Sequence, residues 1–154
     1  MRISNISQIF GSGNTVFATE LINGSARHWN LTLTDNETGN PIDLTNYTFE
    51  FDTVDATATI KSKDARKSNF TVNDLTIQEG ASPTDRSSLI SVVSATDGQI
   101  GVYLPVDFYS GTVPFDAEEN VPVVVGTIRF SDGQAQPTIH SIRLLIVVRY
   151  GVVV

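Results

Sequence analysis

The sequence contains no cysteine among its 154 residues, so neither a disulfide framework nor a thiolate site is available to this protein. It also lacks any run of about 20 apolar residues, the length that a membrane-spanning helix requires. The first ten residues contain no apolar stretch of signal-peptide length. We therefore expect a chain that is made and kept soluble, with no membrane partner.

Basic residues are scarce, since 10 Lys and Arg against 17 Asp and Glu give a net charge of −7. Nucleic-acid binding requires clustered cations that release counterions from phosphates. The basic cluster at Lys61, Lys63, Arg66 and Lys67 has no interleaved aromatic residue on which a base could stack. We interpret this cluster as a solvated loop and expect no nucleic-acid partner.

Catalytic and metal-binding motifs are also missing. The two histidines, His28 and His140, stand in no metal-ligand spacing such as HxH or HExxH. The sequence has no GxSxG elbow, no phosphate-binding P-loop and no GxGxxG fingerprint. Residues 35–37 resemble the start of an acidic calcium loop, but the glutamate that would complete an EF-hand is absent. We predict that the protein is not an enzyme and binds no cofactor or metal.

The sequence does contain short segments that alternate apolar and polar residues with the period of a β-strand. Trp29, Leu31 and Leu33, for example, fall on one side of an extended segment. Turn-forming pairs such as Asp97-Gly98 separate these segments. The pattern predicts a helix-poor β-sandwich with strands at residues 15–21, 27–35, 47–54, 56–62, 70–77, 88–95, 99–104, 121–130 and 138–150.

Two regions depart from the strand pattern. We interpret residues 1–13 as a short N-terminal arm, which either docks on a partner or is a frayed terminus. Residues 61–84 are mostly polar and predict one long inserted loop, which a sandwich tolerates at low entropic cost. The expected organisation is therefore an arm followed by a single β-sandwich domain over residues 14–154.

The last predicted strand is apolar on both faces. Leu145 and Val147 fall between the alternating apolar residues of 142–150, and a terminal Val152-Val153-Val154 follows. An isolated two-layer sandwich covers only one face of a strand, so we expect this edge to pack against another subunit or a neighbouring protein. The alternative is that the N-terminal arm or the 61–84 loop covers it within the chain.

Residues 32–51, TLTDNETGNPIDLTNYTFEF, resemble a signature of the N-terminal immunoglobulin-like domain of tailed-phage baseplate upper proteins. That signature is an apolar strand, an Asp, Gly-x-Pro-Ile-Asp-Leu-Thr and a second apolar strand. The Asp97-Gly98 turn before Leu104-Pro105 and the final hairpin are similar as well. The resemblance covers about residues 27–148 and implies an all-β fold, a single immunoglobulin-like antiparallel β-sandwich. The family's long C-terminal extension has no counterpart here, which favours an assembly role over host binding.

The resemblance implies a virion structural protein of a tailed phage, in the baseplate, neck or tail. Its expected partners are other virion structural proteins and copies of itself, after synthesis in the host cytoplasm. The alternatives are a capsid decoration protein and a carbohydrate-binding module at the virion surface, with sugars stacked on the aromatic residues of loop 108–115. The proposed contact residues are Ile3, Ile6, Phe10, Phe108, Tyr109, Phe115, Leu145, Val147, Val152, Val153 and Val154.

Overall fold

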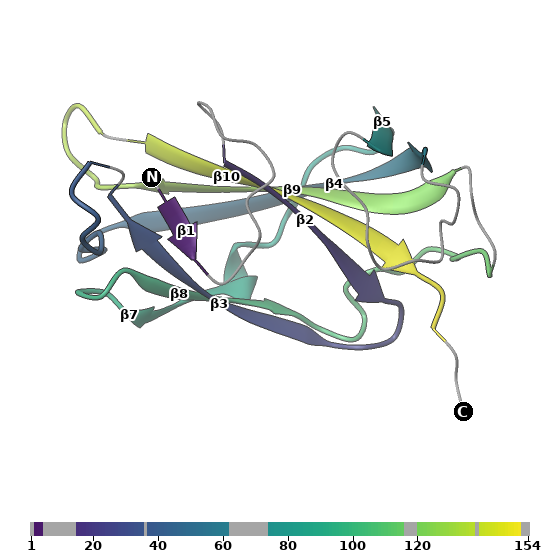
Figure 1. Cartoon of the computed structure of the whole chain (residues 1–154), viewed down its shortest axis with the longest axis horizontal. Helices are drawn as coiled ribbons and strands as arrows, with labels where there is room; N and C mark the ends of the chain where they lie inside the picture. Colours follow the sequence, from purple (N-terminus) through teal and green to yellow (C-terminus); the bar gives the residue numbers. More distant parts are fainter. Residues whose placement is uncertain are drawn as a thin grey trace.

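The computed structural model describes residues 2–4, 15–35, 37–61, 74–115, 120–137 and 139–151. In this part of the chain two β-sheets pack face to face, and no α-helix is present (Figure 1). The prediction of an all-β sandwich is therefore confirmed. None of the described residues forms a helix with the length and hydropathy that crossing a membrane would require.

The two sheets have four and six strands. The four-stranded sheet is antiparallel and consists, in spatial order, of β1 (Arg2–Ser4), β3 (Arg27–Thr34), β8 (Gln99–Leu104) and β7 (Ile90–Ser94). The six-stranded sheet consists, in spatial order, of β2 (Thr15–Ile22), β10 (Ile139–Arg149), β9 (Val121–Ser131), β4 (Thr48–Ile60) and β5 (Leu75–Glu79), with β6 (Thr84–Asp85) also paired to β4. A short 3₁₀ turn, η2 (Ser87–Leu89), leads from β6 into β7.

The strand order is that of an immunoglobulin-like sandwich. Strands β1, β3, β8 and β7 take the places of A, B, E and D, and β10, β9 and β4 take those of G, F and C. Strand β5 occupies the place of an added C′ strand beside β4. The loops consequently gather at the two ends of the sandwich, where they can present side chains to a partner.

The main core lies between the two sheets. Leu31 and Leu33 point into it from β3, and Phe51, Ile128 and Ile146 point into it from the facing sheet. Successive side chains of a strand point to opposite faces, so the core residues of a strand are spaced two apart, as Leu31 and Leu33 are.

A second apolar cluster lies on the outer face of the six-stranded sheet, and β4 contributes to both clusters. Phe51 of β4 faces the main core, whereas Ala56 and Ala58 of the same strand belong to the outer cluster. Strand β4 pairs with β9 from Thr48 to Ala58 without a register shift. The two strands predicted at 47–54 and 56–62 are therefore one strand of 13 residues, in which the apolar positions change face. The outer cluster comprises Ala56, Ala58, Ile60, Val121, Val123, Val125, Leu145 and Val147.

Strand β10 is not an edge strand, because β9 pairs with it on one side and β2 pairs with it in parallel on the other. Val147 is fully buried in the single chain and Leu145 almost fully. Leu75 and Ile77, which belong to the predicted 61–84 loop, pack against the same outer cluster. The expectation that Leu145 and Val147 form an interface is therefore wrong, because their face is already covered within the chain.

The start of the predicted N-terminal arm is also part of the sandwich. Residues 2–4 form β1 and pair with β3, so that the backbone of Ile3 lies opposite Leu33. The predicted contact residues Ile6, Phe10, Val152, Val153 and Val154 lie outside the described residues.

Residues 39–45, the Gly-x-Pro-Ile-Asp-Leu-Thr segment, form a corner at one end of the sandwich. Asp43 Oδ1 accepts hydrogen bonds from the Thr45 hydroxyl (2.6 Å) and from the Thr45 backbone N–H (3.0 Å). These bonds stabilise the carboxylate and lower the pKa of Asp43 below its usual value. Leu44 is buried in the main core, and its N–H donates to the carbonyl of Ala95 in the turn between β7 and β8 (2.8 Å).

Gly98, in that β7–β8 turn, is packed directly against the corner. Its φ is +66°, and a Cβ at this position would lie 2.6 Å from the carbonyl oxygen of Leu33 and 2.9 Å from that of Ile42. The N–H of Leu33 donates to the carbonyl of Gly98 (2.8 Å), which fixes this close approach. Only glycine combines the left-handed backbone with the absent side chain that the site requires.

We predict that Gly98→Ala destabilises the fold far more than Gly24→Ala does. Both glycines have positive φ, but a Cβ at Gly24 would meet no atom within 4 Å, so Gly24→Ala isolates the backbone cost. The collision at Gly98 should add about 1–3 kcal/mol, the usual cost of overpacking. Chemical denaturation of the two variants measures the difference, and equal free energies of unfolding would contradict this account of the corner.

Candidate docking surface

Three large apolar side chains are exposed at the end of the sandwich opposite the corner. Phe115 is 68% exposed, Tyr150 is 46% exposed and Ile22 is 43% exposed. The rings of Phe115 and Tyr150 meet edge to face, with their centres 5.2 Å apart and their planes at 88°. We call these three residues the terminal patch. Exposed apolar side chains that contact one another, as Phe115 and Tyr150 do, mark binding surfaces more often than isolated ones do.

Strands β2 and β10 bring Ile22 and Tyr150 to the same end. They run side by side in parallel and finish together, with Arg149 opposite Ile22 (Figure 1). The N–H of Asn23 donates to the carbonyl of Arg149 (2.9 Å), and Gly151 then passes so close to Asn23 that a Cβ would collide with its carbonyl. The Arg149 guanidinium pairs with Glu20 at 3.3 Å, which ties the two strands together beside the patch. The backbone of the patch is therefore held on both strands.

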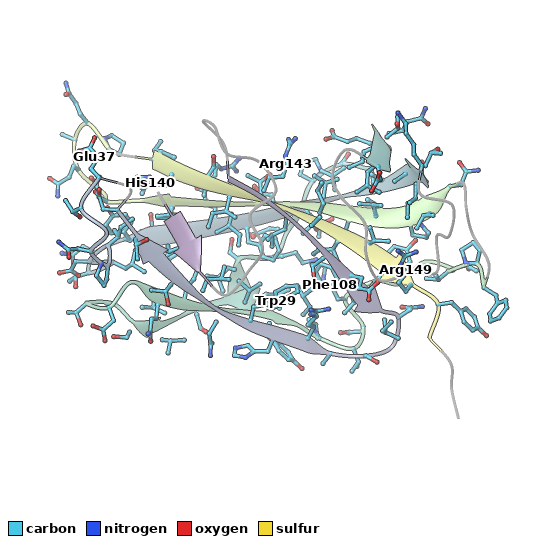
Figure 2. All side chains as sticks on the ribbon, in the orientation of Figure 1. Trp29, Glu37, Phe108, His140, Arg143 and Arg149 are labelled. Carbon is cyan, nitrogen blue, oxygen red and sulfur yellow. The ribbon has the colours of Figure 1, made fainter. Side chains whose placement is uncertain are left out.

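The loop from residue 105 to 115 supplies Phe115 to the patch. Phe108 and Val113 of this loop are buried in the main core, and Figure 2 shows Phe108 between the two sheets. Tyr109 is half-buried and its ring lies against Gly111. Burial raises the pKa of the Tyr109 phenol, and the nearby charge of Asp55 raises it further. The loop is thus anchored inside the sandwich by some side chains and exposes Phe115 at its end.

The structure separates the sequence-predicted contact residues into different classes. Phe108 is a core residue, so its prediction as a contact residue is wrong, and Tyr109 is only partly accessible. Phe115 is exposed as expected and meets the end of the last strand, so two segments that were predicted separately come together. Ile22 was not predicted as a contact residue, and Tyr150 was expected only as part of the apolar last strand. Tyr150 continues the alternation of that strand beyond the core, whereas Ile22 directly follows the core residue Leu21 and lies on the opposite face of β2.

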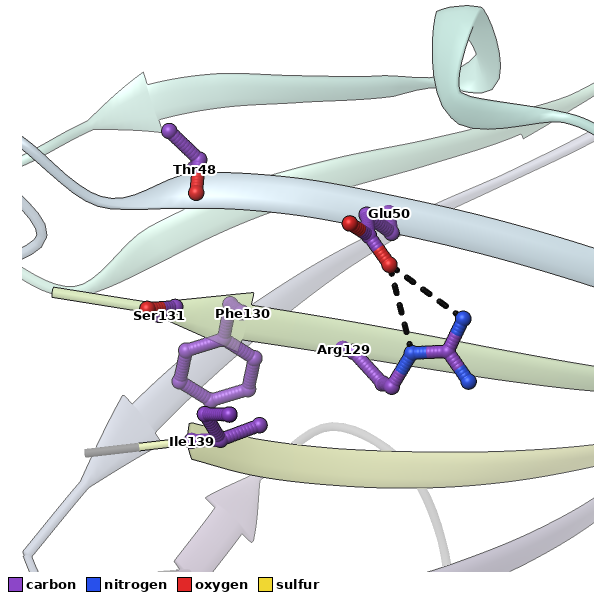
Figure 3. A pocket seen from close by; sticks show the side chains of 6 residues that line it. All are labelled: Thr48, Glu50, Arg129, Phe130, Ser131 and Ile139. Atoms are coloured by element: carbon purple, nitrogen blue, oxygen red, sulfur yellow. Dashed lines mark hydrogen bonds and ion pairs between the residues drawn. The ribbon is translucent and has the colours of Figure 1, made fainter. Parts of the chain in front are cut away.

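A shallow pocket of about 100 Å³ lies near the other end, on the outer face of the six-stranded sheet (Figure 3). Arg129 on its rim contacts Glu50 at 3.2 Å and Asp52 at 2.7 Å, so two carboxylates already neutralise its charge. Small-molecule sites usually enclose about 300 Å³ or more. Among the described residues, no group of three His, Cys, Asp or Glu side chains could hold a metal ion. The pocket is lined by Thr48, Glu50, Arg129, Phe130, Ser131 and Ile139.

His140 lies beside this pocket on an aromatic cluster. Its ring stacks on Phe130, with centres 5.0 Å apart, and Phe130 also contacts Phe49 and Tyr47. Burial against this cluster lowers the pKa of His140 below its usual 6.5, and the charge of Asp132 partly offsets the effect. His140 therefore belongs to the packing of the sandwich end (Figure 2).

We predict that His140 makes the fold less stable as the pH falls below about 6.5, because the unfolded chain binds the proton more readily than the folded chain does. The substitution His140→Phe keeps an aromatic ring on Phe130 and removes the titration. Thermal unfolding between pH 7.5 and pH 5 should show a shallower loss of stability for His140→Phe than for the wild type. This range lies above that in which Asp35, Asp43 and Asp85, whose pKa values are lowered, take up protons. Parallel slopes in the two proteins would contradict the prediction.

Comparisons with protein-family models, with curated proteins and with solved structures found no match for this chain. The relation to the immunoglobulin-like domains of phage baseplate proteins consequently stays a prediction from the sequence. The assignment of the fold rests on the strand order of the structure.

Proposed function

We propose that this chain is a non-enzymatic structural protein of a tailed-phage virion, in the baseplate, neck or tail. It acts by docking on copies of itself and on other virion proteins. The observation that carries the proposal is the terminal patch, in which Phe115 and Tyr150 expose two packed rings at a loop-bearing end of the sandwich. Aromatic residues are enriched in the buried centres of protein interfaces.

The architecture supports a docking role. Symmetric assemblies place the same patch on every copy, so one exposed apolar surface serves many contacts. The corner at residues 39–45 is the segment that carries the phage resemblance, and Asp43 accepts two hydrogen bonds from Thr45 within it. That corner specifies a fold rather than an activity, so it supports the proposed relation to the phage proteins. The terminal patch supports the proposed docking role.

The exposed ring of Phe115 also favours a second candidate, a carbohydrate-binding module. Sugar recognition on β-sandwiches uses flat rings beside polar side chains. The third member of the patch, Ile22, is aliphatic, and the ring of Tyr150 stands at 88° to that of Phe115. This geometry suits a packed protein interface better than a flat stacking platform. A capsid decoration protein would use the same patch in the same way.

We predict that Tyr150→Ser weakens self-association whereas Tyr103→Ser leaves it unchanged. Tyr103 is a matched control, because it is 47% exposed against 46% for Tyr150 but lies on β8 of the other sheet. The dissociation constant should rise roughly 30-fold or more, as expected when a hot-spot side chain worth about 2 kcal/mol is truncated. Light scattering after size-exclusion chromatography, over a range of concentrations, measures the constant.

The same experiment distinguishes the two candidates. A chain that stays monomeric at every concentration, and whose binding to a glycan panel is lost in Phe115→Ser, would support the carbohydrate-binding module instead. A separate experiment tests the location. Peptides of this chain should be found in purified particles of the phage that encodes it. Particles without such peptides would exclude a virion component.

A further inference from the structure

Arg86 connects the turn before β7 to the loop that carries Phe115. Its Nη2 donates a hydrogen bond to the carbonyl of Phe108 (3.3 Å), and its Cζ lies 5.0 Å above the centre of the Phe108 ring. The backbone of Arg86 is itself fixed, because its N–H donates to Phe51 O (2.6 Å) and its carbonyl accepts from Leu89 N–H (2.9 Å). One side chain therefore contacts both the backbone and the ring of Phe108 from a rigid position.

The cost of placing an arginine here shows that these contacts matter. Arg86 is half-buried and forms no ion pair with any described residue, and its Nε is buried without a hydrogen-bond partner. A buried donor without a partner destabilises the folded state, because the N–H loses its hydrogen bond to water and gains none in return. A methionine of similar length would avoid this cost if the position required only apolar contact. The contacts to Phe108 are the favourable interactions that offset it.

Phe108 is the point at which the loop enters the core. It is buried, and its N–H donates to the carbonyl of Pro105 (3.0 Å), which closes the turn directly after β8. The chain then passes Tyr109 and the buried Val113 before it reaches Phe115. Any movement of Phe108 would move the start of this short loop, and with it the ring that meets Tyr150.

We propose that Arg86 is a positioning residue for the terminal patch: it clamps Phe108 and thereby holds the 105–115 loop in the conformation that exposes Phe115. The clamp acts within one chain and does not depend on what the patch binds. Its effect on docking rests on the proposed function. The two parts of the inference can therefore fail independently.

The test compares Arg86→Met with Arg143→Met by hydrogen exchange of the full-length chain at a concentration where it is monomeric. Arg143 is exposed on the outer face of β10, so Arg143→Met is the control for losing an arginine. In Arg86→Met, amides of residues 106–113 should exchange about tenfold faster or more, as expected for losing a hydrogen bond from a charged donor. Amides of β9 and β10 should change little. In Arg86→Lys the cation above the ring remains and the planar guanidinium is lost, so the loop should show an intermediate rate.

Each outcome decides one part of the inference. If the loop amides exchange at an unchanged rate, Arg86 has no local role and the clamp is overturned. If all amides of the chain accelerate equally, Arg86 stabilises only the fold as a whole, and the clamp is overturned as well. If Arg86→Met does not fold, the same comparison is made with Arg86→Lys. Self-association is then measured on the variant with the loosened loop. Weaker association supports positioning for docking, whereas unchanged association leaves the clamp and removes Phe115 from the docking surface.

Discussion

A β-strand can give each side chain to only one face, and the six-stranded sheet of this protein requires apolar side chains on both. In β4 the apolar positions change face along the strand, whereas β9 and β10 carry apolar residues on both faces over part of their length. In β9, Val124 and Ile128 point into the main core, while Val123 and Val125 belong to the outer cluster. Gly126 lies on the core face between Val124 and Ile128. Its missing side chain leaves room for the ring of Phe51, since a Cβ at Gly126 would lie 2.8 Å from Phe51 Cε1.

This arrangement determines which surfaces remain for a partner. The outer face of the six-stranded sheet is apolar and buried in the half of the sheet where β10 ends, around Val123 and Val147. Toward the corner it is polar, with Arg129 bridging Glu50 and Asp52. Neither half is a free apolar face. The exposed aromatic residues at the end of the sandwich are consequently the better candidates for contact, which agrees with the use of loops as binding elements on rigid β-sandwiches.

The sequence predicted most strand positions, because local alternation is a property of neighbouring residues. The predicted 99–104 and 121–130 agree with β8 and β9 to within one residue. The two segments at 47–54 and 56–62 were separated wrongly, because a phase change in one long strand has the same local pattern as a break between two. The cover over Leu145 and Val147 was not predictable from alternation, since it depends on residues distant in the sequence. The same holds for the contact between Phe115 and Tyr150.

The two ends of the sandwich are held by different interactions, and the difference bears on function. Backbone hydrogen bonds hold the corner, where Leu33, Ile42 and Gly98 approach one another within a few ångström. At the opposite end, side-chain contacts anchor the 105–115 loop, since Phe108 is buried under Arg86 while Phe115 is exposed. A loop fixed in this way loses little conformational entropy on binding, so an exposed ring at its end contributes more of its contact energy to affinity. The contacts of the half-buried Arg86 with Phe108 therefore offset the cost of its unpaired Nε, and under the clamp proposed above they also keep Phe115 in position for a partner.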